Sequence, residues 1–331
     1  MARLFLPPAV VAVLACAAVF FIGGAGAFLT VLLLSILEIA LSFDNAIVNA
    51  EILRRTNAFW RRRFLTWGII IAVVGARLVL PLLLVAAAAW ASPFLVAKLA
   101  FSDGAAYAAL LSGAHFAINA FGASFLLLLA LRYFFDSEKT VHWIRAIEKQ
   151  LSRLGDVEAL EVAIVLWVVL IVSGFIALPE RAAVLIAGIA AVLLSVAIEA
   201  FVRYFSKMGG GTRSHGFFLF VYLNILDSAF SLDGVAGAFA LTFSLPLIVV
   251  GLGIGAYFVR TLTVYLVEHR VLESLRYIEH GAYWAIFGLA FSMFVNLFLS
   301  VPEIVTGTAG AAFMLAAYVS SVRVGRADVV H

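Results

Sequence analysis

Long apolar stretches, separated by short polar connections, follow one another along almost the whole of this chain. About 20 consecutive apolar residues suffice to cross the hydrocarbon core of a bilayer as a helix. Stretches of this kind lie near 4–22, 27–52, 64–90, 106–134, 159–178, 182–204, 217–243, 246–267, 281–300 and 303–322. The pattern predicts an all-α polytopic membrane protein with about ten transmembrane helices.

Composition supports this class. Of the 331 residues, 65% are hydrophobic and 12% are charged, whereas a soluble domain has about 25% charged residues. The lipid bilayer is therefore the expected surrounding. A net charge of +3 is too small to indicate a nucleic-acid partner. The single cysteine, Cys16, excludes an internal disulfide framework and a cysteine-rich metal site.

The basic residues predict the orientation. Lys and Arg concentrate in cytoplasmic connections of membrane proteins. If the chain crosses the membrane at these ten stretches, all but four of its 22 Lys and Arg lie on one side of the membrane. The exceptions are Lys98 and Arg181 on the other side, and Arg77 and Arg260 inside spans. Both termini are therefore expected in the cytoplasm.

The N-terminal run admits two interpretations. It could be a secretory signal peptide that ends at the small residues of segment 24–27, or it could be a first transmembrane helix. The apolar run over 4–22 is longer than a signal core of about 7–15 residues. The pattern favours a transmembrane helix.

The longest polar connection, over 136–158, has apolar residues at helical spacing among Lys, Arg and Glu. These residues are Val141, Ile144, Ile147, Leu151 and Leu154. The spacing predicts an amphipathic helix. Such a helix could lie on the cytoplasmic membrane surface or pack on the helix bundle, and the sequence leaves both open.

Two acid-bearing motifs stand out inside the apolar stretches. The segment 34–45 reads Leu-Ser-Ile-Leu-Glu-Ile-Ala-Leu-Ser-Phe-Asp-Asn, and the segment 223–234 reads Leu-Asn-Ile-Leu-Asp-Ser-Ala-Phe-Ser-Leu-Asp-Gly. Glu38 thus corresponds to Asp227, and Asp44 to Asp233. A carboxylate at the bilayer centre costs about 3 kcal/mol or more and indicates a functional site.

The same correspondence continues along the chain. Gly68 precedes Arg77 by the nine residues that separate Gly251 from Arg260, and an isoleucine follows each glycine by three positions. The chain therefore divides into two repeats of five spans, 1–180 and 181–331. An odd number of spans inverts the second repeat in the membrane, and inverted repeats of transporters carry their substrate site at the repeat interface.

The four deep acids and two deep arginines leave two negative charges, which one divalent cation would neutralise. Carboxylate and amide oxygens suit Mn²⁺, Ca²⁺ or Mg²⁺, whereas softer metals recruit Cys, Met or His. The expected metal ligands are Glu38, Asp44, Asp227 and Asp233. Buried acids can also take up protons.

Helix geometry limits how these acids share an ion. Six helical residues turn about 600° and advance about 9 Å, so Glu38 and Asp44 cannot meet on one regular helix. Either the helix breaks between Ser42 and Asn45, or acids of different helices meet, with Asp44 and Asp233 as the central pair. Other supporting polar residues are Ser42, Asn45, Asn224, Ser231, Arg77, Arg260 and His115.

Alternative roles remain for several of these residues. Arg77 and Arg260 could hold the acids in structural salt bridges, and His115 could make a packing hydrogen bond instead of serving as a ligand or proton relay. An intramembrane aspartyl protease would need two aspartates, but the Gly-x-Gly-Asp element is missing. We therefore expect no enzymatic activity and no required cofactor beyond the bound or transported cation.

The Ser-x-Asp-Asn sequence at 42–45, with its acid-centred counterpart in the second half, resembles the TerC-like integral membrane proteins of the LysE exporter superfamily. The resemblance extends from about Thr30 to Tyr318. It implies a bacterial inner-membrane transporter, with manganese export as the expected activity. Asp233-Gly234 departs from the Asp-Asn or Asp-Ser of other members, and compact members have fewer than ten spans.

A second function stays open at this point. A non-transporting membrane protein could bind the metal and associate with metal-dependent or stress-resistance proteins. The sequence also leaves open whether the chain forms a homo-oligomer or has a membrane-associated protein partner.

Overall fold

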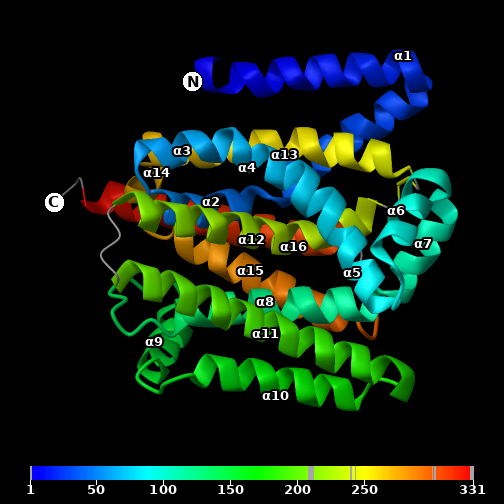
Figure 1. Cartoon of the computed structure of the whole chain (residues 1–331). Coiled ribbons are helices and arrows are strands. Elements are labelled where there is room, and N and C mark those ends of the chain that lie inside the picture. Colours follow the sequence, from blue (N-terminus) through cyan, green and yellow to red (C-terminus); the bar gives the residue numbers. More distant parts are fainter. Residues whose placement is uncertain are drawn as a thin grey trace. The chain divides into compact units, whose positions relative to one another are not determined.

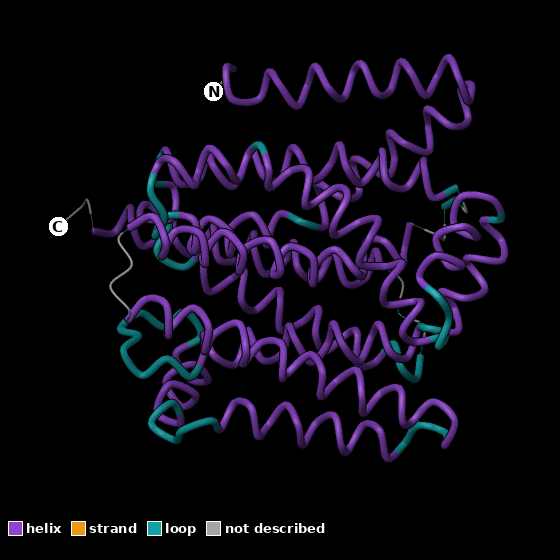
Figure 2. The backbone as a smooth tube through the Cα atoms, in the orientation of Figure 1, coloured by secondary structure: helices purple, strands orange, loops and turns teal. Residues whose placement is uncertain are grey.

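The computed structural model of the chain describes residues 2–207, 212–238, 241–242, 244–299, 301 and 303–328. Within these ranges every regular element is a helix and no strand occurs (Figure 2). The prediction of an all-α protein is confirmed for this part of the chain.

Five helical segments of the described residues are long and apolar enough to cross a membrane. They are Leu4–Leu41, His115–Phe134, Leu178–Ala200, Leu245–Glu268 and Ile278–Val295. Shorter apolar helices lie at Pro93–Ser102, Leu160–Gly174, Gly216–Ser228 and Thr308–Val324. These helices indicate a lipid bilayer environment.

The helices divide into two compact units. Unit 1 comprises Met1–His115 and Val202–His269, and unit 2 comprises Phe116–Phe201 and Arg270–His331. The helices of unit 1 are α1 (Ala2–Leu41), α2 (Phe43–Leu53), α3 (Ala58–Leu65), α4 (Trp67–Ile70), the π-helix η1 (Ile71–Val79), α5 (Leu80–Ala88), α6 (Pro93–Ser102), α7 (Gly104–Gly113), α12 (Thr212–Ala238) and α13 (Leu245–Glu268). Those of unit 2 are α8 (His115–Phe134), α9 (Arg145–Leu154), α10 (Leu160–Gly174), most of α11 (Leu178–Lys207), α14 (Val271–Ser274), α15 (Ile278–Val295) and α16 (Glu303–Asp328).

In unit 1, α1 packs closely on α13 because α13 carries glycines where α1 approaches. A Cβ atom added at Gly251 would lie 2.6 Å from Cβ of Leu34, and one added at Gly255 would lie 2.5 Å from Cβ of Glu38. Small residues four positions apart let membrane helices approach at backbone distance. The close approach brings the first motif acid against α13.

The first two predicted spans are interrupted in ways that matter for the site. Gly24 has φ 76°, and α1 changes direction sharply along its length (Figure 1). A second break at Ser42, with φ −98° and ψ 17°, separates α1 from α2. The helix is thus distorted at Ser42 itself, at the edge of the segment 42–45 where the sequence left a break open, and Asp44 lies in the first turn of α2.

The predicted span 64–90 is helical but segmented. It continues from the end of α3 through α4, η1 and α5. The wider π-helical turn contains Arg77, whose Nη1 donates to the carbonyl oxygen of Ala72 over 3.0 Å. π-Helical segments are rare and frequently occur at functional sites.

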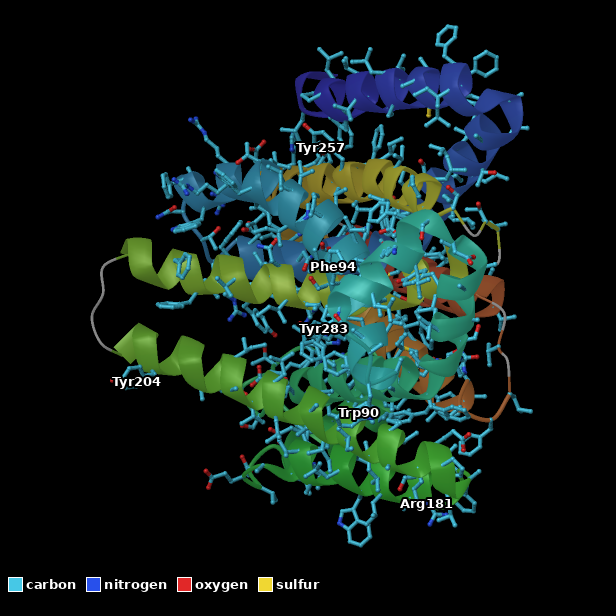
Figure 3. All side chains as sticks on the ribbon, turned by 45° about the vertical axis from the view of Figure 1, so that its right-hand side comes forward. Trp90, Phe94, Arg181, Tyr204, Tyr257 and Tyr283 are labelled. Carbon is cyan, nitrogen blue, oxygen red and sulfur yellow. The ribbon has the colours of Figure 1, made fainter. Side chains whose placement is uncertain are left out.

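The outer surface of the helices is largely apolar. Trp90 and Phe94, both labelled in Figure 3, are 91% and 81% exposed. Large exposed aromatic and aliphatic side chains would favour aggregation in water, but they are the expected covering of a helix in lipid.

Candidate functional site

The first motif acid, Glu38, is buried near the end of α1 and is paired with Arg77 of η1. Their side chains are 4% and 3% exposed, and Nη2 of Arg77 donates to Oε1 of Glu38. The Ser42 hydroxyl donates to the same oxygen over 3.0 Å. A charged donor and a neutral donor thus compensate this buried carboxylate.

Asp227, the second-half counterpart of Glu38, is paired with Arg260 of α13. Nη2 of Arg260 donates to Oδ2 of Asp227 over 2.8 Å and to Oδ1 of Asn224 over 3.1 Å. The guanidinium also lies over the Phe64 ring, 4.3 Å from its centroid. Gly68 leaves room for it, because a Cβ atom there would lie 2.4 Å from Nη1.

The two ion pairs therefore occupy corresponding places in the two halves of the sequence. In each pair an arginine that follows a glycine by nine residues holds the first acid of a motif. The arginines have the salt-bridge role that the sequence left open for them.

Two contacts show how α12 runs beside the first motif. A Cβ atom added at Gly234 would lie 3.2 Å from Oε2 of Glu38, so the α12 backbone passes this carboxylate. Further along, Nδ2 of Asn49 donates to Oδ1 of Asp227 over 3.5 Å. The order of these contacts makes α12 antiparallel to the α1–α2 segment. In the α1–α2 segment Asp44 lies between Glu38 and Asn49. In α12 position 233 lies between Asp227 and Gly234.

Glycine at position 234 suits the close approach of the α12 backbone to Glu38. The family resemblance leads one to expect Asn or Ser at this position. With Glu38 at 3.2 Å from an added Cβ atom, a larger residue would push the carboxylate away. Glycine is thus matched to the close approach of α12.

Asp44 differs from the two paired acids. It is 8% exposed, and its Oδ1 accepts a hydrogen bond from the backbone N–H of the adjacent Asn45 over 2.9 Å. Among the described residues no Lys, Arg or His forms an ion pair with it. A place in the first turn of α2 favours a negative charge because the helix dipole is positive there.

Two amide oxygens of α2 are buried without a hydrogen-bond partner among the described residues. They are Oδ1 of Asn45 and Oδ1 of Asn49, whose residues are 6% and 0% exposed. The two residues are four positions apart and share one face of α2. A buried acceptor left unpaired costs about 1–3 kcal/mol, so this face offers acceptor oxygens to a ligand.

Asn49 was not singled out by the motif comparison. Its counterpart in the second motif is Ala238, so the repeat gives no hint of it. The available signal is a second amide in the apolar run, one helical turn beyond Asn45. Asn224, in contrast, was expected as a cation ligand, and its Oδ1 accepts from Arg260.

The other expected site residues are Ser231, Asp233 and His115. The side chains of Ser231 and Asp233 lie outside the described residues, although both positions belong to α12. His115 begins α8 and is half-buried. No group of three or more His, Cys, Asp or Glu side chains suited to a metal occurs among the described residues.

A further buried acid lies in unit 2, where the pattern of residues indicated none. Glu148 of α9 is 0% exposed. It accepts hydrogen bonds from Nδ1 of His280 over 2.7 Å and from Nε1 of Trp284 over 2.9 Å. The backbone N–H groups of Trp143 and Ile144 complete the set at 3.0 and 3.4 Å.

The Nζ atom of Lys139 lies 3.6 Å from Oε2 of Glu148, and it also lies over the ring of Tyr133. Tyr133 stacks on Tyr283, which is labelled in Figure 3, with ring centroids 3.7 Å apart. Burial by itself would raise the pKa of Glu148, but the hydrogen bonds from His280 and Trp284 and the Lys139 charge outweigh it and lower the pKa to about 2. Burial lowers the pKa of Lys139 to about 8. This acid is fully compensated within its own unit.

Comparison with known proteins gives a family. The chain matches the family described as "Protein of unknown function (DUF475)" over residues 43–328, and it belongs to that family. No curated protein matches the chain, and no solved structure matches it.

Proposed function

We propose that this member of the DUF475 family is a membrane transporter that exports a divalent cation, with Mn²⁺ as the foremost candidate and Ca²⁺ and Mg²⁺ as others. The cation would bind where α2 crosses α12, with Asp44 and Asp233 as the central pair. The amide oxygen of Asn45, the next residue in the chain, would add a neutral ligand. Glu38 and Asp227 would serve as outer groups.

The observation that carries this proposal is the incomplete compensation of Asp44. Burying a charge is costly unless it is paired or coordinates a metal. Asp44 is buried, has no ion-pair partner among the described residues, and is followed in the chain by Asn45, whose buried amide oxygen has no hydrogen-bond partner there. Carboxylate and amide oxygens are the ligands that Mn²⁺, Ca²⁺ and Mg²⁺ prefer.

The charge distribution supports a divalent cation. Arg77 and Arg260 each neutralise one acid, and the proposed central pair of Asp44 and Asp233 carries two further negative charges. Their two charges equal the charge of one divalent cation. Protons are an alternative load for the same carboxylates, which suggests cation–proton exchange as the driving reaction.

The proposal includes ten membrane crossings in two inverted five-helix repeats. It is supported by the equivalent ion pairs and by the antiparallel crossing of the two motifs. The predicted spans 27–52 and 64–90 also fall in unit 1 together with their counterparts 217–243 and 246–267. Transporters built from inverted repeats bind their substrate between the repeats. The TerC-like resemblance adds manganese export from a bacterial inner membrane, with both termini cytoplasmic.

The test is Mn²⁺ flux across sealed vesicles that contain the purified protein. We expect flux in the parent and at least a ten-fold loss in Asp44→Asn, because this change removes a ligand charge at nearly constant volume. Glu51→Gln is the matched control. Glu51 lies two turns further along α2, is buried, and is paired with Arg54 and Arg55, so its loss should leave flux close to the parent value.

The outcomes separate the candidate functions. Flux in neither protein, together with Mn²⁺ binding by the parent alone, would replace transport with the non-transporting metal-binding function. Equal flux in the parent and Asp44→Asn would remove the site. Flux that ignores an imposed pH gradient would contradict proton exchange while leaving transport in place.

A further inference from the structure

The surface of α9 divides into three stripes along its length. Successive residues of an α-helix are rotated by about 100°, so residues three, four or seven apart share a face. Glu148 and Ser152 form the buried stripe. Ile147, Leu151 and Leu154 form the apolar stripe. Arg145, Lys149 and Arg153 form the basic stripe and are all exposed.

The buried stripe is polar, which is unusual for an amphipathic helix. α9 attaches to unit 2 through the Glu148 carboxylate, which His280 and Trp284 of α15 hold by hydrogen bonds. Its C-terminal end is fixed by a close approach, because a Cβ atom added at Gly155 would lie 1.6 Å from the carbonyl oxygen of Phe135. In the apolar stripe Leu151 is partly buried, and Ile147 and Leu154 are exposed.

The apolar stripe consequently faces outward. Ile147 is 45% exposed and Leu154 is 42% exposed, and Val157 just beyond the helix is 52% exposed. The basic stripe lies on roughly the opposite side of the helix. An apolar edge and a basic edge separated in this way are typical of helices that lie in the plane of a membrane interface.

The position of α9 in the chain brings its apolar stripe near the membrane surface. α9 lies between the C-terminus of α8, a candidate membrane span, and the N-terminus of the apolar helix α10. It is therefore tethered within reach of the end of a membrane helix. The exposed basic residues complement anionic lipid headgroups.

We propose that α9 is an interfacial helix whose apolar stripe enters the lipid surface and whose basic stripe binds anionic lipid headgroups. Glu148 fixes the rotation of α9 about its axis, so that Ile147 and Leu154 point into the lipid instead of into the bundle. The partner is the bilayer that already surrounds the protein, and the inference is independent of cation transport.

The test uses the full-length protein with Cys16→Ala and one new cysteine, either Leu154→Cys or Lys149→Cys, each carrying an environment-sensitive fluorophore. The proteins are reconstituted into phosphatidylcholine vesicles and into vesicles in which part of the lipid is phosphatidylglycerol. Nitroxide-labelled lipid quenches probes in the bilayer, and iodide quenches probes in water. Both substitutions lie at exposed positions outside the Glu148 network, so folding should be retained.

We expect the probe at 154 to be quenched several-fold more by nitroxide lipid than the probe at 149, with the reverse order for iodide. Phosphatidylglycerol should enlarge the difference, and the added changes Arg145→Gln, Lys149→Gln and Arg153→Gln should abolish this enlargement in the 154-labelled protein. Equal iodide access to both positions would overturn the interfacial placement and indicate a protein partner or free solvent. Lipid quenching at 154 without any effect of phosphatidylglycerol would overturn the anionic-lipid assignment.

Discussion

Asp44 in unit 1 and Glu148 in unit 2 are both buried carboxyl groups, at 8% and 0% exposure, but their surroundings are opposite in kind. Glu148 accepts from two side chains and two backbone N–H groups and has Lys139 nearby. Asp44 accepts one hydrogen bond from the backbone of Asn45, whose own amide oxygen is buried without a partner among the described residues.

The comparison shows that the partners of a buried acid, and not its burial alone, indicate its role in an apolar protein. Burial is common to both and indicates only that the charge must be compensated. A complete set of internal partners assigns Glu148 to holding α9 in place. An incomplete set among the described residues is the basis of our proposal that Asp44 binds a ligand from outside the chain. Variants of Glu148, of its surroundings and of Asp44 test this difference separately.

The largest effect on stability is expected for Glu148→Ala. The change removes the acceptor of His280, Trp284 and two backbone groups, and breaking a buried ion pair costs about 3–5 kcal/mol. Denaturant titration in detergent would measure the loss. The control is Glu138→Ala, an exposed acid of the same connection, which should change the free energy of unfolding by less than about 0.5 kcal/mol.

A slightly smaller effect is expected from pH. The pKa of Glu148 is lowered from 4.5 to about 2, so the folded state holds its carboxylate ionised where the unfolded state takes up a proton. The stabilisation is complete above pH 4.5 and is lost as the pH falls toward 2. It amounts to about 3 kcal/mol.

The measurement is the difference between the acid unfolding curves of the parent and Glu148→Gln. Other carboxyl groups titrate in the same range and cancel in this difference. Parallel curves for the two proteins between pH 5 and pH 2 would contradict the assignment of Glu148 as a compensated acid.

An intermediate effect is expected for Gly155→Ala. The added Cβ atom would meet the backbone of Phe135 at 1.6 Å, so the end of α9 must shift and the Glu148 hydrogen bonds must lengthen. Overpacking of this kind costs about 1–3 kcal/mol. Gly174→Ala is the control, since a Cβ atom there meets nothing within 4 Å. Equal thermal unfolding of both variants would count against the close contact.

The smallest effect on stability is expected for Asp44→Asn. Removing a buried charge without an internal partner relieves a cost, so the free energy of unfolding should stay within about 1 kcal/mol of the parent value or rise. The stabilisation by added Mn²⁺ should disappear. For the parent it should reach about 2.7 kcal/mol at a cation concentration one hundred times Kd. A loss of stability as large as that of Glu148→Ala would show that Asp44 has a structural role.

Helical content could be predicted from the sequence because long apolar runs permit little else than helices in lipid, and acids within such runs, such as Glu38, Asp44 and Asp227, are buried. The repeat also identified Arg77 and Arg260 as partners for the acids, since their spacing recurs in both halves. Asn49 could not be found in this way, because its counterpart is an alanine. Its relevance depends on the face of α2 that meets α12.

Glu148 could not be recognised as buried for a related reason. In the sequence it is one charged residue among several in a polar connection, and the apolar residues that mark the segment as amphipathic lie on a different face of the helix. The close approach at Gly155 and the donors on α15 decide the rotation of α9. The hydrogen bonds from α15 join residues more than 100 positions apart.

The sequence by itself determined the membrane class, the helical elements and the presence of more deep acids than deep arginines, because these depend on composition and periodicity along the chain. Only the tertiary structure decided which acids the arginines neutralise and which acid they leave over. A charge is compensated by whatever lies within a few ångströms of it, and in this protein those neighbours come from helices that are distant in the sequence.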